Sequence, residues 1–296
     1  MKPNKARRRT MLYIPGNNPG MLQNGPIFGA DSVLLDLEDS VAATQKDAAR
    51  LLVASVMKSI DFGATEVTVR VNHLDTPFGM ADIEAIVPLQ PSAIRFPKID
   101  RPEDVHRVVE AVERIEDKHG LPHDKMKIHP LIETALGVEN AFAIGGASPR
   151  IDAFSIGGQD LTADLQVAKT RDGEAIDYAR RRLVMAAKAL KIDVIDTVWA
   201  DVDDEEGLRA ETEHIKKLGF CGKAVINPRQ IPTVHEVFTP TADEVRKAER
   251  IFREYLRQKA LGVGVFAIDG KMIDAPVVAR ARRTLELACV DVEALA

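Results

Sequence analysis

Short apolar runs of strand length alternate with longer stretches of helical periodicity along most of this 296-residue chain. Helical patterns are clearest at 104–119 and 176–190, where apolar residues recur every three or four positions. Eight strand–helix pairs in order predict an α/β fold of the (β/α)8 (TIM) barrel class. The strand-like runs occupy residues 11–14, 32–37, 66–71, 93–96, 127–132, 151–156, 193–197 and 222–226.

The turn after the first run argues against the other common arrangement of alternating strands and helices. A doubly wound open sheet usually has a glycine-rich first turn of the form Gly-x-Gly-x-x-Gly. Residues 15–20 read PGNNPG instead, so the barrel is the favoured fold.

Residues 262–296 follow the eighth unit, and a barrel needs no further strand. Glycines flank a short apolar stretch there, which favours a hairpin or lid, and a tail packed on the barrel base is the alternative. We therefore predict a barrel over residues 1–261 and a C-terminal lid or extension over residues 262–296.

Charge and cysteine content exclude several classes of protein. A net charge of -5 and an aromatic content of 5% argue against nucleic acid as the main partner. No apolar run approaches membrane-spanning length, so we expect no membrane association. Cys221 and Cys289 fit neither a disulfide framework nor a Cys-x-x-Cys site, which makes a reducing cytoplasm the expected location. A solvated, frayed terminus is expected for the basic start of the chain, Lys2, Lys5, Arg7, Arg8 and Arg9.

Polar side chains follow several of the predicted strands. Arg70 ends the third run, Glu133 follows the fifth, and Asp160 follows the sixth. The carboxyl ends of barrel strands meet at one mouth, so we expect these side chains to gather there. Two carboxylates suit a hard divalent cation such as Mg²⁺, and a guanidinium suits a substrate carboxylate. Further polar residues at the same ends are Asp36, Glu38, Asp39 and Lys98.

Three other interpretations of these residues are weaker. Acids that follow strands often cap the next helix, which would explain Asp39 and Asp36 better than Glu133. Phosphosugar barrels bind phosphate after strands seven and eight, but residues 201–206 are strongly acidic here. A Schiff-base aldolase would need a desolvated lysine, for which Lys98 is the best placed.

Eight segments carry a resemblance to a known family. The chain resembles the β subunits of citrate lyase, within the wider citrate lyase and HpcH/HpaI aldolase superfamily. The resemblance implies a (β/α)8 barrel and covers nearly the whole chain. The matching segments are RTMLYIPG (9–16), GADSVLLDLEDSV (29–41), VRVN (69–72), RFPK (95–98), IE (132–133), GFCGK (219–223), INPRQ (226–230) and GKMID (270–274).

The same resemblance implies roles for individual residues. Glu133 and Asp160 match the family's Mg²⁺ ligands, and Arg70 matches the arginine that grips the keto-acid carboxylate. Asp274 matches a C-terminal carboxylate that acts as acid/base, in related lyases on a neighbouring subunit's site. Glu133 is also expected to contact the substrate. Residues expected to surround the site and hold the ion and its waters in place are Glu38, Asp39 and Lys98.

The resemblance also implies a reaction and partners. The expected reaction is Mg²⁺-dependent cleavage of a citryl thioester to oxaloacetate and an acetyl thioester, with an acyl-CoA or an acyl-carrier-protein thioester as substrate. Partners would be citrate lyase α and γ subunits and further copies of the chain, as a homotrimer or larger. Arg8 and Arg9 are candidates to meet the carrier's phosphates. The alternatives are a free-standing malyl-CoA or citramalyl-CoA lyase and a non-catalytic barrel scaffold.

Overall fold

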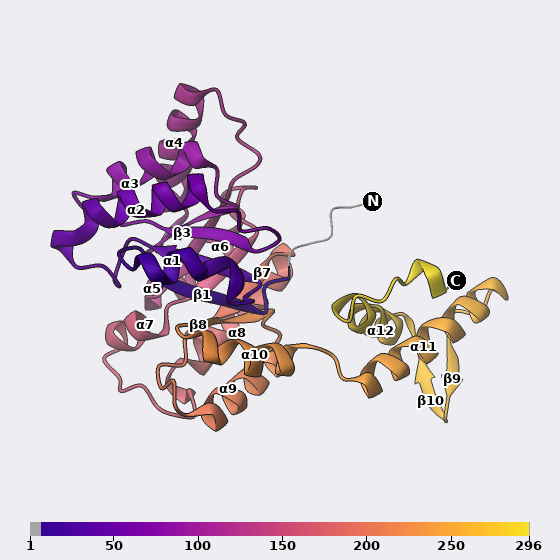
Figure 1. Ribbon diagram of the computed structural model, residues 1–296. Coiled ribbons are helices and arrows are strands. Elements are labelled where there is room, and N and C mark those ends of the chain that lie inside the picture. Colours follow the sequence, from indigo (N-terminus) through magenta and orange to yellow (C-terminus); the bar gives the residue numbers. More distant parts are fainter. Residues whose placement is uncertain (1–6, 296) are drawn as a thin grey trace. The chain divides into compact units, whose positions relative to one another are not determined.

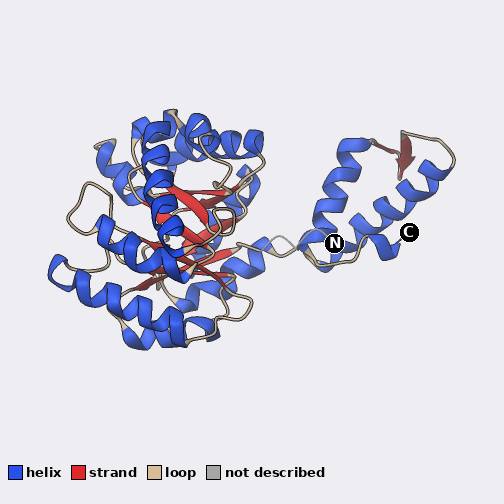
Figure 2. Ribbon diagram, turned by 90° about the horizontal axis from the view of Figure 1, so that it is seen from above, coloured by secondary structure: helices blue, strands red, loops and turns tan. Residues whose placement is uncertain are grey.

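The computed structural model describes residues 7–295, and the chain divides into two compact units between His235 and Glu236 (Figure 1). In the first unit, parallel strands close into a barrel in sequence order, and helices surround it (Figure 2). This confirms the predicted (β/α)8 barrel. The strands are β1 (Thr10–Pro15), β2 (Ser32–Asp36), β3 (Glu66–Arg70), β4 (Ala93–Phe96), β5 (Lys127–Ile132), β6 (Ala153–Ile156), β7 (Asp193–Asp196) and β8 (Gly222–Val225).

The helices of the first unit follow the strands. Helix α4 shows the local logic: Pro102 opens it, Asp104 caps backbone N–H groups before it, and Gly120 ends it in the left-handed conformation. Helices α2, α3 and α4 pack side by side outside the barrel (Figure 1). The helices are α1 (Pro19–Asn24), α2 (Lys46–Ser59), α3 (Gly79–Ile86), α4 (Pro102–His119), α5 (Ala135–Glu139), α6 (Ala141–Gly146), α7 (Gly158–Asp164), α8 (Asp177–Leu190) and α9 (Glu205–Leu218), with α10 (Ile231–Phe238) across the boundary.

The inside of the barrel is apolar on one side and polar on the other. Met11, Leu34 and Ile195 form a buried apolar cluster there. Strand register puts Thr68 beside Leu34, and Arg95 beside both Arg70 and His129, so β3, β4 and β5 contribute polar side chains to the interior. The barrel therefore buries charge beneath its mouth.

The amino end of the barrel is closed by Arg8. Its guanidinium is buried and lies 2.7 Å from Glu66, 2.9 Å from Asp152 and 3.2 Å from Asp193. Arg9 pairs with Asp31 at 2.8 Å. The prediction of a frayed terminus was therefore wrong for these two arginines. The predicted contacts with the carrier's phosphates were wrong as well, because both arginines lie at the barrel end opposite the strand carboxyl ends. Lys2 and Lys5 lie outside the described residues.

The second unit is built on a helix pair and a hairpin. Helices α11 (Ala242–Ala260) and α12 (Ala275–Leu287) pack around Phe252, Ile273 and Leu285. Strands β9 (Phe266–Ile268) and β10 (Lys271–Ile273) form an antiparallel hairpin, as the flanking glycines indicated. The predicted boundary at 261/262 was too late, because α11 packs against α12 and belongs to the second unit.

Within residues 7–295, no helix is both long and apolar enough to cross a membrane.

Candidate active site

A cavity of about 360 Å³ opens at the carboxyl ends of the barrel strands. Arg70, Glu133 and Asp160 all line it, so the structure brings the predicted trio together. The remaining wall is mostly apolar, which would exclude water around a bound ligand. These other lining residues include Tyr13, Pro15, Leu131, Ile156, Val198, Ala224 and Ile226.

Three carboxylates hold the Arg70 guanidinium. Asp36 takes its fork at two points, with Nε 2.7 Å from Oδ1 and Nη2 2.8 Å from Oδ2. Nη1 lies 2.8 Å from Glu38 and 3.2 Å from Asp39. The guanidinium carbon of Arg70 also lies 5.3 Å from the centre of the Tyr13 ring, which is a cation–π contact. The position of Arg70 is therefore fixed before any ligand binds.

Asp36 does not cap the next helix, which was the alternative interpretation of this acid, because the N-cap positions there are Ala42 and Gln45. It is fully buried and serves Arg70, while also accepting hydrogen bonds from the N–H groups of Glu38 and Ser40. Burial alone would raise the pKa of Asp36, but the Arg70 guanidinium outweighs burial and holds that pKa below its ordinary value. The register of β2 and β3 pairs Asp36 with Arg70, and this register is the signal that would have found the contact.

Glu133 is a buried carboxyl with no ion-pair partner among residues 7–295. Its Oε1 accepts a hydrogen bond from the backbone N–H of Lys98 at 2.8 Å, and only 2% of the residue is exposed. Burial raises the pKa of Glu133 to about 8, and the charges of Asp160 and Glu38 add to that effect. The ionised form therefore needs a cation that no described residue supplies through an ion pair.

Asp160 lies in the first turn of α7, and no hydrogen bond or ion pair with the described residues occupies its carboxylate. Two glycines shortly before it lie against the side chains of Glu133 and Thr197. A Cβ on Gly157 would lie 2.6 Å from Glu133 Cβ and Oε2, and one on Gly158 would lie 2.8 Å from Thr197 Oγ1. Glycine is thus required where the chain passes Glu133 and Thr197, a close approach that the sequence analysis missed.

The two acids fit a divalent cation that completes its coordination with water and substrate. Within residues 7–295, no group of three or more His, Cys, Asp or Glu side chains forms an all-protein metal cage. Mg²⁺ does not need one, since it usually takes one or two carboxylates and keeps several waters. Such an ion would neutralise the negative charge of the Glu133 and Asp160 carboxylates.

The residues predicted to surround the site contribute in different ways. Glu38 is buried beside Arg70, and burial raises its pKa to about 7, with Asp39 and Asp36 adding to the effect and Arg70 opposing it. Asp39 is exposed at its outer side. Lys98 acts through its backbone N–H, while its side chain points to solvent. This exposure removes the desolvation that a Schiff-base lysine would need.

Asp274 lies in the second unit, at the N-cap of α12. Its Oδ1 accepts a hydrogen bond from the N–H of Val277 at 3.1 Å, so it stabilises the start of that helix. The acid/base role stays a prediction.

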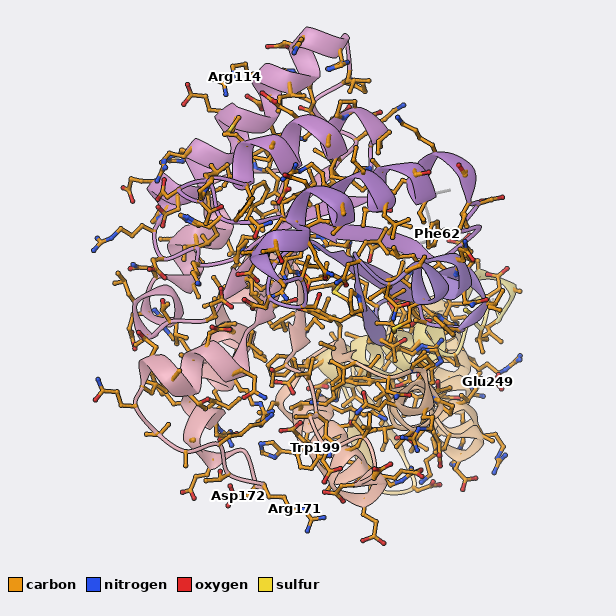
Figure 3. The ribbon with its side chains drawn as sticks, turned by 60° about the vertical axis from the view of Figure 1, so that its left-hand side comes forward. Phe62, Arg114, Arg171, Asp172, Trp199 and Glu249 are labelled. Carbon is orange, nitrogen blue, oxygen red and sulfur yellow. The ribbon has the colours of Figure 1, made fainter. Side chains whose placement is uncertain are left out.

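A second cavity of about 520 Å³ lies beside the loop after β7. Trp199 and Arg171 line it, and Figure 3 labels both side chains. Arg171 pairs with Asp204 at 2.8 Å, and Arg229 pairs with Asp203 at 3.0 Å, so arginines partly neutralise the acidic loop. The carboxylate pair and the Arg70 fork belong to the first cavity alone.

The fold and the site define a (β/α)8-barrel protein with an acid pair and a clamped arginine at its mouth. Residues 9–228 match the HpcH/HpaI aldolase/citrate lyase family, and the chain belongs to that family. The β subunit of citrate lyase from Leuconostoc mesenteroides subsp. cremoris is 41% identical over 96% of this chain and 94% of its own length. A mitochondrial citramalyl-CoA lyase from Rattus norvegicus is 34% identical over 95% of this chain and 86% of its own length.

A solved structure extends the likeness to both units. Protein CitE from Mycobacterium tuberculosis, in complex with magnesium, acetoacetate and coenzyme A, superposes with a TM-score of 0.78. It is 29% identical and covers 96% of this chain and 99% of its own.

Proposed function

We propose that this chain is a Mg²⁺-dependent carbon–carbon lyase, a citrate lyase β subunit that cleaves a citryl thioester to oxaloacetate and an acetyl thioester. The observation that carries the proposal is the pair Glu133 and Asp160, two acids in one cavity without a cationic partner among the described residues. Similarity to citrate lyase β subunits and to a relative bound to magnesium and coenzyme A supports the same conclusion.

Glu133 and Asp160 would hold the ion, and the ion would lower the pKa of the substrate hydroxyl and neutralise the adjoining carboxylate. Asp36 already fills the fork of Arg70. A substrate carboxylate would therefore approach at Nη1 and displace Asp39, which has the longest contact at 3.2 Å and a largely exposed side chain. Arg70 then offsets charge at the carbon that becomes the keto group.

Asp274 is proposed to accept the hydroxyl proton as base, which lets the carbon–carbon bond break, releases oxaloacetate and leaves a thioester enolate. The apolar wall of the cavity keeps bulk water from the enolate. Protonation of the enolate completes the reaction, and Asp274 is proposed as the acid. Its carboxyl now caps α12, so this role requires Asp274 to leave Val277 or to share its second oxygen.

The second candidate is a free-standing citramalyl-CoA or malyl-CoA lyase. The 34% identical citramalyl-CoA lyase favours it, since the same site would serve a smaller acyl group. A non-catalytic scaffold would be expected to lack part of the trio, and all three residues are present.

Three further expectations belong to the proposal. The chain is proposed to work with citrate lyase α and γ subunits on a carrier-bound thioester. It is also proposed to form a homotrimer or larger assembly in which residues 262–296 pack on a neighbouring subunit. Its location is proposed to be the cytoplasm.

The test is a cleavage assay with citryl-CoA, citramalyl-CoA and malyl-CoA, each with Mg²⁺ or EDTA. Citryl-CoA should be cleaved fastest, only with Mg²⁺, and the Glu133→Gln variant should lose most of the activity. Glu110→Gln, an exposed position on α4, is the matched control. Absence of cleavage for all three thioesters would contradict the lyase assignment, and faster cleavage of citramalyl-CoA would select the second candidate.

A further inference from the structure

Arg95 is unusual among the buried arginines of this chain. Arg8, Arg70, Arg150 and Arg180 each lie within 2.7–2.9 Å of a carboxylate. Arg95 is fully buried, has no ion pair with any described residue, and leaves Nε and Nη2 without a hydrogen-bond partner. Burial lowers the pKa of its guanidinium, yet an arginine in a protein keeps its charge. An uncompensated positive charge therefore lies inside the barrel.

Among residues 7–295, the hydrogen bond that the Arg95 side chain makes points toward the cavity. Nη1 donates to the hydroxyl of Tyr13 at 3.0 Å, and Tyr13 is a lining residue. Since its oxygen accepts from Arg95, the hydroxyl proton of Tyr13 remains available to a ligand. A hydroxyl that accepts from a cation is also a stronger donor, because the cation polarises it.

The charges in the cavity indicate which ligand group would accept a hydrogen bond from the Tyr13 hydroxyl. Asp36 already fills the fork of Arg70, and the first substrate carboxylate would take the place of Asp39 at Nη1, so Arg70 has no position left for a second carboxylate. A citryl group carries two carboxylates, whereas citramalyl and malyl groups carry one. The second carboxylate needs a donor of its own in a cavity rich in acids.

We propose that Tyr13 is the specificity-determining residue that donates to the second carboxylate of a citryl group, and that Arg95 is the positioning residue behind it. This inference rests on the proposed function. It assigns to the Arg95–Tyr13 pair the selection of a dicarboxylic keto acid, oxaloacetate, over a monocarboxylic one such as pyruvate.

The experiment measures the affinity of the Mg²⁺-loaded protein for oxaloacetate and for pyruvate by calorimetry. Tyr13→Phe keeps the ring beneath Arg70 and removes only the hydroxyl. It should weaken oxaloacetate binding by about ten-fold or more and change pyruvate binding by less than about three-fold. Tyr178→Phe is the matched control, because Tyr178 is exposed on α8 and donates to Glu139.

Arg95→Met keeps the volume and should reduce the same preference. If it does not fold, Tyr13→Phe decides alone. The inference is overturned if the wild-type protein does not prefer oxaloacetate, or if Tyr13→Phe weakens both ligands equally, which is the result of a purely structural role.

Binding is independent of turnover, so the two hypotheses fail separately. A preference lost in Tyr13→Phe supports the inference even if no thioester is cleaved. Cleavage of citryl-CoA with an unchanged preference in Tyr13→Phe supports the function and rejects the inference.

Discussion

Replacing Glu133 by Gln is expected to stabilise the protein in EDTA at neutral and alkaline pH. The pKa of Glu133 is raised from 4.5 to about 8 by burial first, then by Asp160 and Glu38. A raised carboxyl pKa means that the fold favours the protonated form. The contribution of Glu133 to the free energy of unfolding is therefore complete below about pH 4.5 and is lost as the pH rises through about 8.

The size of the effect follows from that difference. At about 1.4 kcal/mol per pH unit, a pKa raised from 4.5 to about 8 corresponds to about 5 kcal/mol in all, of which about 3 kcal/mol is lost by pH 7. Gln stays neutral and keeps an acceptor for the N–H of Lys98. The variant should thus avoid most of this loss.

Urea unfolding in EDTA at pH 5, 7 and 8.5 measures the effect. The free energy of unfolding of Glu133→Gln should exceed that of the wild type by under about 1 kcal/mol at pH 5 and by several kcal/mol at pH 8.5. Glu110→Gln should show no such trend. A difference independent of pH, or a variant less stable than the wild type at pH 8.5, would refute the reasoning.

Three other substitutions test separate parts of the structure. Arg8→Met removes the cation that Glu66, Asp152 and Asp193 share at the amino end of the barrel and should cost about 3–5 kcal/mol in urea unfolding, with KM unchanged. A raised KM would contradict this placement. Gly157→Ala puts a methyl group against Glu133 and should weaken Mg²⁺ binding, measured by calorimetry, at least about ten-fold. The circular dichroism spectrum should stay unchanged, and full Mg²⁺ affinity would disprove the close approach. Asp274→Asn preserves the α12 cap and therefore Tm but should reduce kcat, whereas Asp274→Ala should lower both Tm and kcat. Normal turnover in the Asn variant would exclude the acid role.

The strand positions and the grouping of Arg70, Glu133 and Asp160 could be predicted from the sequence. The strands follow from local sequence pattern, and the grouping follows from the geometry of a parallel barrel. Residues 93–96 and 127–132 were predicted as strands and form β4 and β5 with the same bounds. Once parallel strands are placed, their carboxyl ends meet, which brings Arg70, Glu133 and Asp160 together.

Contacts that depend on tertiary structure were not readable in the same way. The acid Asp36 looks like a cap until the β2–β3 register pairs it with Arg70. Lys98 contributes a backbone N–H, which any residue except proline has, so its side chain gave no signal. The amphipathic pattern of α11 shows that one face is buried but not which helix covers it, and the unit boundary was misplaced for that reason.

The Mg²⁺ requirement of citryl-CoA cleavage tests the central claim most directly. Oxaloacetate release is followed while Mg²⁺ is titrated into wild-type protein and into Asp160→Asn, with Asp172→Asn on the exposed loop as control. The account predicts no release in EDTA, saturation of the wild type and of the control at the same Mg²⁺ concentration, and a requirement raised at least about ten-fold in Asp160→Asn. Equal Mg²⁺ dependence in all three proteins, or full activity in EDTA, would contradict it.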